Sequence, residues 1–201
     1  MGFLANSLSL VRYQVEGDLP DGFWDFAGQR LTQFAFRDID DAYDERSVGW
    51  VSIHNMFDAG FAGTSFAVAD YLVASLRIDE RRVAPAVLKK FCQKEEEKKK
   101  AQEKRPRLSR AERVEIKERM QLVLLKRAAP VPAVFDLVWS LGDQTVYFGS
   151  SNQKIRGIFE SLFAETFGLS LLLQIPFLVA GQMLPPEEAA ALDALSPCLF
   201  V

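Results

Sequence analysis

The segment Arg81–Arg127 reads RRVAPAVLKKFCQKEEEKKKAQEKRPRLSRAERVEIKERMQLVLLKR and decides how the chain is organised, because its charge differs from that of the sequence on either side. It holds seventeen of the 24 lysines and arginines but only seven of the 27 aspartates and glutamates. Its formal charge is therefore +10, whereas the remaining 7 basic and 20 acidic residues give −13, and the net charge of −3 conceals the difference. Such a split indicates a partner that is held electrostatically, with nucleic acid as the first candidate.

A second interpretation of this segment stays open. Stretches rich in lysine and glutamate often form only a solvated helix, held by ion pairs between residues four positions apart. Glu95–Lys99 and Glu96–Lys100 have this spacing, and we expect both pairs to form. The charge pattern alone therefore allows either a surface that attracts a polyanion or a solubilising helix.

The first half of the segment predicts a helix with an apolar root and a charged end. Between Val83 and Phe91, apolar residues form a stripe of about two turns. From Gln93 to Arg105 only Ala101 is apolar, so this part cannot be buried against a core and must project into water or toward a partner. Pro106 then ends the helix.

The second half predicts a return helix from Arg110 to about Arg127. Ser109 is the candidate N-cap, and Glu112 follows it at the spacing of a capping box. The two halves together predict a helical hairpin, and a helix of twenty residues would carry its tip about 30 Å outward. The stripe that faces inward near the base of the return helix consists of Ile116, Met120, Val123 and Leu124.

The rest of the sequence predicts a core of the α+β class. A chain of 201 residues with 49% hydrophobic content can bury a sizeable core. We expect one or two antiparallel-rich sheets with packed helices and a protruding basic helical hairpin. The core would comprise residues 1–80 and 128–180, the hairpin residues 81–127 and a C-terminal tail residues 181–201. Strands are predicted at 7–15, 47–54, 66–78, 134–140, 145–148 and 171–178, and helices from Pro20-Asp21-Gly22 onward, from Ser150 or Ser151 to Gly168, and from 185 to about 195.

Cysteine usage and hydropathy predict the compartment. Cys92 and Cys198 are the two cysteines, and we expect them to pack as small apolar residues in a reducing compartment. The N-terminus lacks the pattern of a signal peptide, and the apolar stretch 169–184 is too short and too interrupted to span a membrane. We therefore expect a cytoplasmic protein that makes no contact with a membrane.

No motif predicts a catalytic, metal or cofactor site. His54 is the single histidine, and the sequence contains no nucleophile elbow, no phosphate-binding P-loop and no dinucleotide fingerprint. The acidic stretch Asp38–Glu45 could offer carboxylates to Mg²⁺, but its spacing does not match an EF-hand, and a solvated loop is the preferred interpretation. We expect no enzymatic activity and no cofactor, with a Mg²⁺-dependent nuclease as an alternative.

Several pieces of sequence, taken in order, resemble the RdgC family of recombination-associated proteins. The resemblance covers roughly residues 3–178 and marks the chain as a short member that lacks most of the family's C-terminal portion. The pieces are GFLANSLSLVRY near the N-terminus, Val48-Gly49-Trp50-Val51, Val83-Ala84-Pro85-Ala86-Val87-Leu88, Leu124-Leu125-Lys126-Arg127-Ala128, the strand with Trp139, and Ser150-Ser151-Asn152-Gln153-Lys154.

The resemblance implies a nucleoid-associated homodimer that binds double-stranded DNA without sequence preference and restrains RecA-type recombinase by competing for DNA. Because the chain is short, an open dimer is expected rather than a closed ring. Neutralisation of phosphates by lysine and arginine supplies affinity that does not depend on sequence. The candidate phosphate-binding residues at the matching positions are Lys89, Lys90, Lys94, Lys98, Lys99, Lys100, Lys104, Arg105, Arg107 and Arg110.

The charge division also supports a different function. The hairpin could be a protein-interaction arm that docks on the acidic body of a second subunit. This alternative predicts an assembly that dissociates with salt and no binding to DNA.

Overall fold

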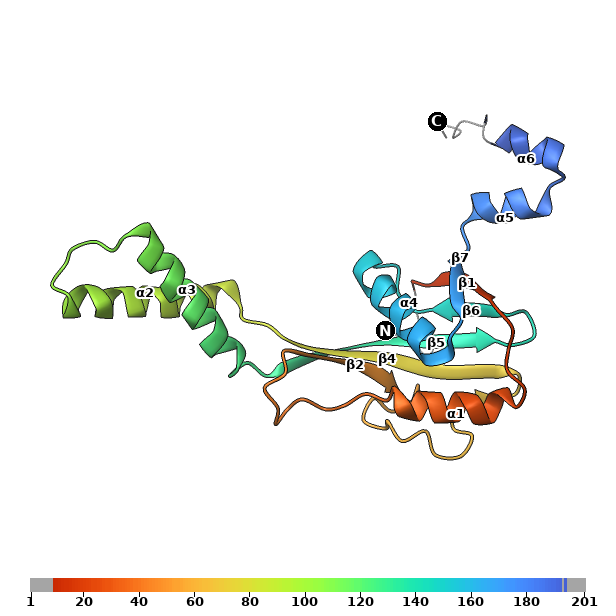
Figure 1. Cartoon of the computed structure of the whole chain (residues 1–201), viewed down its shortest axis with the longest axis horizontal. Helices are drawn as coiled ribbons and strands as arrows, with labels where there is room; N and C mark the ends of the chain where they lie inside the picture. Colours follow the sequence, from red (N-terminus) through yellow and green to blue (C-terminus); the bar gives the residue numbers. More distant parts are fainter. Residues whose placement is uncertain (1–8, 193, 195–201) are drawn as a thin grey trace. The chain divides into compact units, whose positions relative to one another are not determined.

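The computed structural model of the chain describes residues 9–192 and 194, and it divides into two compact units. Among the described residues, the first unit comprises the chain up to Ala35, Trp50–Leu76, and the chain from Phe135 onward. The second unit comprises Phe36–Gly49 and Arg77–Val134. Figure 1 shows the elements of both.

The strands form one seven-stranded sheet in the order β2–β4–β5–β6–β1–β7, with β3 paired to β4. The pairs β1–β6, β1–β7, β3–β4 and β5–β6 are antiparallel. With helices packed on it, this sheet confirms the predicted α+β class and the antiparallel-rich sheet. The strands are β1 (Val11–Glu16), β2 (Arg46–Val51), β3 (Ala67–Val68), β4 (Tyr71–Arg81), β5 (Pro130–Ser140), β6 (Thr145–Phe148) and β7 (Ser170–Leu173).

Two helices cover one face of the sheet in the first unit. Helix α1 (Phe23–Gln33) and helix α4 (Gln153–Phe167) contact each other, and both contact the ring of Trp139 on β5. Trp139 is fully buried, with its ring centroid 5.1 Å from that of Phe23 on α1 and 5.1 Å from that of Phe163 on α4. Burial of each such side chain stabilises the fold by about 1.5–3 kcal/mol.

Helix α4 shows why the phenylalanine spacing predicts this packing. Phe159, Phe163 and Phe167 lie four positions apart, so they share one face of the helix, and all three are buried. The ring of Phe159 stacks on that of Phe148 from β6, with 4.0 Å between centroids and 8° between planes. Gly168 ends the helix in the left-handed region at φ 71°, as predicted for a C-terminal glycine.

A buried hydrogen bond joins β2 to α4 and yields a prediction. The indole N–H of Trp50 donates to Thr166 Oγ1 at 2.8 Å, and both residues are fully buried. Thr166→Val keeps the shape but leaves the indole N–H without an acceptor, so we expect a loss of about 1–3 kcal/mol in the free energy of unfolding, measured by urea denaturation. Thr32→Val on α1 is the matched control, because Thr32 is exposed and its hydroxyl donates only to Gly28 O of its own helix. Equal losses in both variants would contradict this assignment.

Several of the predicted strands are wrong in extent: the strand predicted at 47–54 ends at Val51, and the strand predicted at 134–140 begins at Pro130. Residues 66–78 form no single strand: β3 and β4 are joined by a turn at Ala69-Asp70, where Ala69 adopts φ 51°. The sequence is almost continuously apolar on both sides of this turn, so the hydrophobic pattern alone could not reveal it. The strand predicted at 171–178 ends at Leu173, because Pro176 opens helix α5 (Pro176–Met183).

Smaller differences concern the ends of elements. The side chain of Asn152 caps α4 by accepting from the N–H groups of Lys154 and Ile155, so Ser150 and Ser151 are not the N-cap. The predicted C-terminal helix is present as α6 (Pro186–Leu192). The predicted strand start at Ser7, the packing of Cys198 and the end of the tail lie outside the described residues.

The second unit contains the predicted hairpin. The hairpin consists of α2 (Pro85–Gln102) and α3 (Arg110–Leu125), which contact each other. The same unit also contains the loop Phe36–Glu45. Within residues 9–192 and 194, no helix combines the length and the apolar character that a bilayer crossing requires.

Candidate nucleic-acid interface

The return helix of the hairpin begins as its sequence predicts. Ser109 Oγ accepts from the Glu112 N–H at 3.2 Å, and the Ser109 N–H donates to Glu112 Oε2 at 2.8 Å. The two bonds form a capping box, which gives an acceptor to two backbone N–H groups at the start of the helix. Leu108, just before the cap, is buried and anchors the tip of the hairpin.

The two helices meet along a seam that is mainly ionic. No residue of α2 is buried, and Ile116 is the single buried residue of α3. Charged side chains fill the seam: Lys99 Nζ lies 3.2 Å from Glu112 Oε1, and Arg119 lies 3.4 Å from Glu95. Glu96 faces Arg113 at 3.9 Å.

These contacts correct the prediction of ion pairs within α2. Glu95 and Glu96 pair with arginines of α3, and Lys99 pairs with Glu112, so the expected bonds Glu95–Lys99 and Glu96–Lys100 do not form. A carboxylate in the seam is shielded from water by the opposing helix, so a partner there is favoured over one on the solvated side of its own helix. The predicted inward stripe of α3 is correspondingly thin, since Val123 is 37% exposed.

Three lysines form a row along α2, and the last of them, Lys98, also lines a cavity of about 300 Å³ together with Glu95, Glu103 and Glu115. Lys90, Lys94 and Lys98 are four positions apart, which places them on one face of the helix, and all three are exposed. No carboxylate among the described residues lies within ion-pair distance of them. The row therefore presents three cations to solvent.

The ten residues predicted to bind phosphate fall into two groups. Lys99 and Arg105 are held in ion pairs, Lys99 by Glu112 and Arg105 by Glu103 and Glu112. The other eight make no ion pair with the part of the chain that the structure describes, and all except the half-buried Lys100 are exposed. These eight are Lys89, Lys90, Lys94, Lys98, Lys100, Lys104, Arg107 and Arg110.

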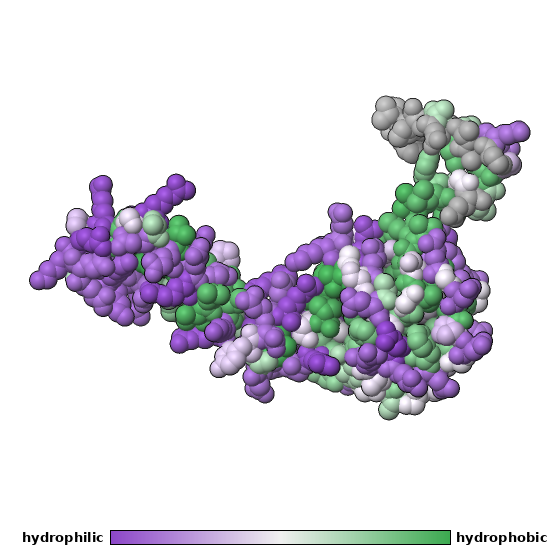
Figure 2. All heavy atoms as spheres, in the orientation of Figure 1, coloured by the Kyte–Doolittle hydropathy of each residue, from purple (hydrophilic) through white to green (hydrophobic). Residues whose placement is uncertain are grey.

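The positions of the glutamates decide how much positive charge the hairpin presents to solvent. Four of its seven glutamates, Glu95, Glu96, Glu103 and Glu112, pair with cations at the seam or the tip. Most of the negative charge is thus neutralised internally, while the lysine row stays outside. Figure 2 shows hydrophilic residues over most of the hairpin surface, as this arrangement requires.

The capping box makes the return helix sensitive to acid. The Ser109 backbone N–H, the Ser109 hydroxyl and Lys99 together lower the pKa of Glu112 from 4.5 to about 2. A lowered pKa means that the contribution of Glu112 is present above pH 4.5 and is lost as the pH falls toward 2. We expect the first turn of α3 to lose order in this window, measured by amide chemical shifts. Glu112→Gln should abolish the transition, and Glu115→Gln, an exposed neighbour, should keep it.

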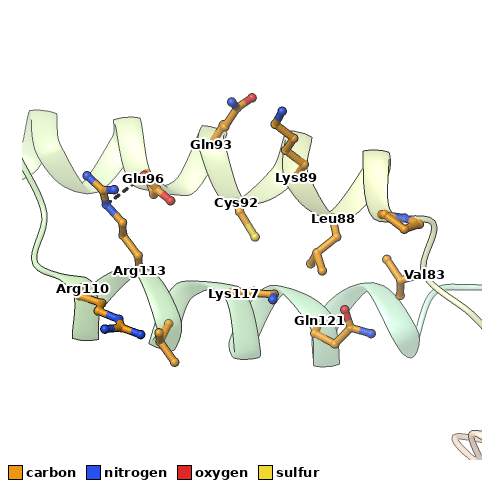
Figure 3. Close-up of a pocket in the computed structure, with 12 residues that line it drawn as sticks. Val83, Leu88, Lys89, Cys92, Gln93, Glu96, Arg110, Arg113, Lys117 and Gln121 are labelled. Atoms are coloured by element: carbon orange, nitrogen blue, oxygen red, sulfur yellow. Dashed lines mark ion pairs between the residues drawn. The ribbon is translucent and has the colours of Figure 1, made fainter.

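A groove of about 850 Å³ runs along one side of the hairpin. Leu88 and Cys92 point into it from α2, as Figure 3 shows, and Arg113 and Lys117 line it from α3. Burial and the carboxylate of Glu96 raise the pKa of the Cys92 thiol. The groove thus has an apolar floor and a cationic rim.

Two buried arginines organise the acidic loop, and the sequence analysis missed both. The Arg81 guanidinium donates to the carbonyl oxygens of Ile39 at 2.6 Å, Asp40 at 3.2 Å, Ala42 at 3.0 Å and Asp44 at 3.1 Å, and also to Ala128 O. Arg81 thus binds backbone oxygens and not the carboxylates of the loop, of which Asp38 lies 4.0 Å from Arg77. Arg81 was counted with the basic segment, but it is buried and cannot contact a partner.

Arg77 holds the start of the same loop. Its guanidinium bonds to both carboxylate oxygens of Asp79, at 2.8 and 2.7 Å, and lies 4.1 Å from the ring centroid of Phe36. The hydrogen bond with Asp79 raises the pKa of Arg77. The signal in the sequence is the alternation Arg77, Asp79, Arg81, which places three charged residues on one face of a strand.

The candidate metal ligands are not brought together. Among the described residues, no group of three or more histidine, cysteine, aspartate or glutamate side chains could hold a metal ion. His54 is exposed and follows β2.

A family model described as "Putative exonuclease, RdgC" matches residues 9–175 of the 201-residue chain. No curated protein matches the chain. The match spans β1 to the residue before α5 and includes the whole hairpin.

Proposed function

The chain belongs to the RdgC family, and from this premise we propose that it binds double-stranded DNA through the phosphate backbone, without sequence preference. The observation that carries the proposal is the row Lys90, Lys94 and Lys98, whose cations have no carboxylate partner among the described residues, while four of the seven glutamates of the hairpin pair with other cations. Four residues of helix rise about 6 Å, so the row spans about 12 Å and can follow several phosphates of one strand.

Contacts of this kind position a protein on DNA but carry no information about base sequence. Lysine acts as a flexible point charge, and the row holds no arginine fork or amide that could read a base edge. The exposed Lys104, Arg107 and Arg110 at the tip would extend the contact. The proposal therefore predicts equal affinity for unrelated duplexes of the same length.

The proposal extends to recombination. A protein that covers duplex DNA non-specifically competes with RecA-type recombinase for the same polymer, and family membership supports this role. We propose that two copies act together as an open dimer associated with the nucleoid. The competition itself would be measured as a delay of strand exchange that excess DNA relieves.

The experiment that tests DNA binding is a salt titration. We expect log K to fall linearly with log salt, with a slope of about −0.9 for each phosphate neutralised, hence roughly −3 to −6 for three to six contacts. Fluorescence anisotropy with two labelled duplexes of unrelated sequence measures both the slope and the absence of preference. A salt-independent affinity, or a preference of more than about tenfold for one duplex, would argue against the proposal.

The matching family model is described as "Putative exonuclease, RdgC", which favours a second candidate function. We propose that this chain binds DNA without cutting it, because the sequence holds no motif for phosphodiester hydrolysis. An end-labelled duplex incubated with the protein in Mg²⁺, and in EDTA as the control, separates the two. Release of labelled nucleotides in Mg²⁺ alone would establish the exonuclease.

A further inference from the structure

The hairpin groove is an uncovered surface of mixed character. Its floor is apolar, with Leu88, Cys92 and Val114, and Val114 is 47% exposed. Its charged lining comprises Lys89, Arg110, Arg113 and Lys117 together with Glu96, and the pairing of Arg113 with Glu96 at 3.9 Å leaves three cations against no further carboxylate. A segment that fills the groove must therefore be apolar on one side and carry negative charge.

The C-terminal helices have the complementary character. Helix α5 contains no charged residue and, apart from Gln182, no polar side chain, which is typical of a helix that is covered by a partner. Ile175, Phe177 and Leu178 are nevertheless 42–49% exposed, and Met183 is 79% exposed. Figure 2 shows hydrophobic residues on the surface of this segment. An exposed apolar patch of this kind marks an interaction site.

The charge of this segment matches the groove as well. Helix α6 packs against α5 and begins with Glu187 and Glu188, and no lysine or arginine follows Arg156 in the sequence. The apolar residues of α5 and the carboxylates of α6 thus form one acidic, apolar unit. The family match ends at residue 175, so this unit is an addition to the part of the chain that the family model covers.

We propose that the α5–α6 segment of one copy of the chain docks in the α2–α3 groove of a second copy. Phe177 and Leu178 would cover Leu88 and Cys92, while Glu187 and Glu188 would face the cationic rim. The dimensions are compatible: α2 lines the groove from Pro85 to Glu96, about 18 Å, and the eight residues of α5 span about 12 Å. Two such contacts, related by a two-fold axis, close a dimer.

Docking in the groove leaves the lysine row free. Cys92 and Glu96 line the groove, and each of Lys90, Lys94 and Lys98 lies two positions from one of them, about 200° around the helix. The inference rests on the pairing of two copies proposed above; the groove shares Arg110 with the proposed DNA contact, whereas the lysine row does not line it. The two properties can therefore be tested separately.

Cross-linking through the native thiol of Cys92 is the direct test. The variant Leu178→Cys, in a Cys198→Ser background, should form a disulfide with Cys92 of the other copy under mild oxidation. The reaction should be run at alkaline pH, because the Cys92 thiol ionises late. A disulfide-linked pair of chains on a non-reducing gel is the expected result. The matched control is Val68→Cys, an exposed position on β3, which should give none. Absence of the linked pair, or a disulfide within one chain, would overturn the inference.

Light scattering separates the failure of this inference from the failure of pairing. We expect Phe177→Ser with Leu178→Ser to raise the dissociation constant of the pair by roughly 30-fold, the value for loss of a central apolar contact. The control Val68→Ser with Tyr71→Ser, also exposed, should not change it. If the double variant pairs as tightly as the parent, the copies meet through another surface and this inference is wrong. If the parent protein stays monomeric, both the docking inference and the proposed pairing of two copies are wrong. Fluorescence anisotropy then still measures DNA binding separately.

Discussion

Reversal of Lys90, Lys94 and Lys98 to glutamate is expected to weaken binding to duplex DNA by roughly 10²- to 10³-fold at about 0.1 M salt. Each phosphate contact contributes close to tenfold under these conditions through release of counterions, so three lost contacts give this range. Because none of these side chains pairs with a carboxylate among the described residues, their replacement should leave the fold unchanged. The slope of log K against log salt should become shallower by about three units.

The control must carry the same change of charge at another place. Arg37, Arg46 and Lys154 are exposed and make no ion pair within the described residues, so their reversal to glutamate alters the net charge equally. We expect this variant to lose affinity by only a few fold, through the weaker overall field. If both triple variants lose affinity equally, the lysine row is not the binding site.

The second large effect concerns stability. Arg81→Met should lower the free energy of unfolding by about 3 kcal/mol or more, because four loop carbonyls and that of Ala128 lose a charged donor in a buried place. For a chain of this size, that loss lowers Tm by roughly 6–12 °C. Calorimetry measures the shift. Arg81→Lys should recover only part of it, since an ammonium group cannot reach all five oxygens.

The neighbouring arginine is the control for this substitution. The side chain of Arg82 is 71% exposed and pairs with Glu80, so Arg82→Met should change the free energy of unfolding by less than about 1 kcal/mol. A shift in Tm after the Arg82 substitution as large as that after the Arg81 substitution would show that the loop is not held by the buried guanidinium.

The sequence predicts much of this fold because several of its signals are local. A capping box at Ser109 and Glu112 depends on neighbouring residues alone, and so does the four-residue spacing of Phe159 and Phe163. The break at Ala69 carries no such signal, since alanine has no preference for the left-handed region that it adopts. A turn enforced by the surrounding sheet is therefore invisible to pattern analysis.

The candidate site was predictable in its charge but not in its pairing. Counting cations located the hairpin, whereas the choice of partner for Glu95 or Glu96 depends on the helix that lies opposite. Strand alternation at Arg77 and Asp79 could have revealed the buried pair, but a run of charged residues is ordinarily exposed. Long-range contacts thus decide which of the charged side chains remain available.

The guanidinium of Arg81 joins the strand that leads into the hairpin to the carbonyl of Ala128, where the chain returns. The hairpin that follows this contact includes α2, in which no residue is buried. The hairpin should therefore open as a separate cooperative unit, and its amides should exchange with deuterium far sooner than those of β4. A region that opens readily can also adapt its shape to an irregular polymer without disturbing the sheet that supports it.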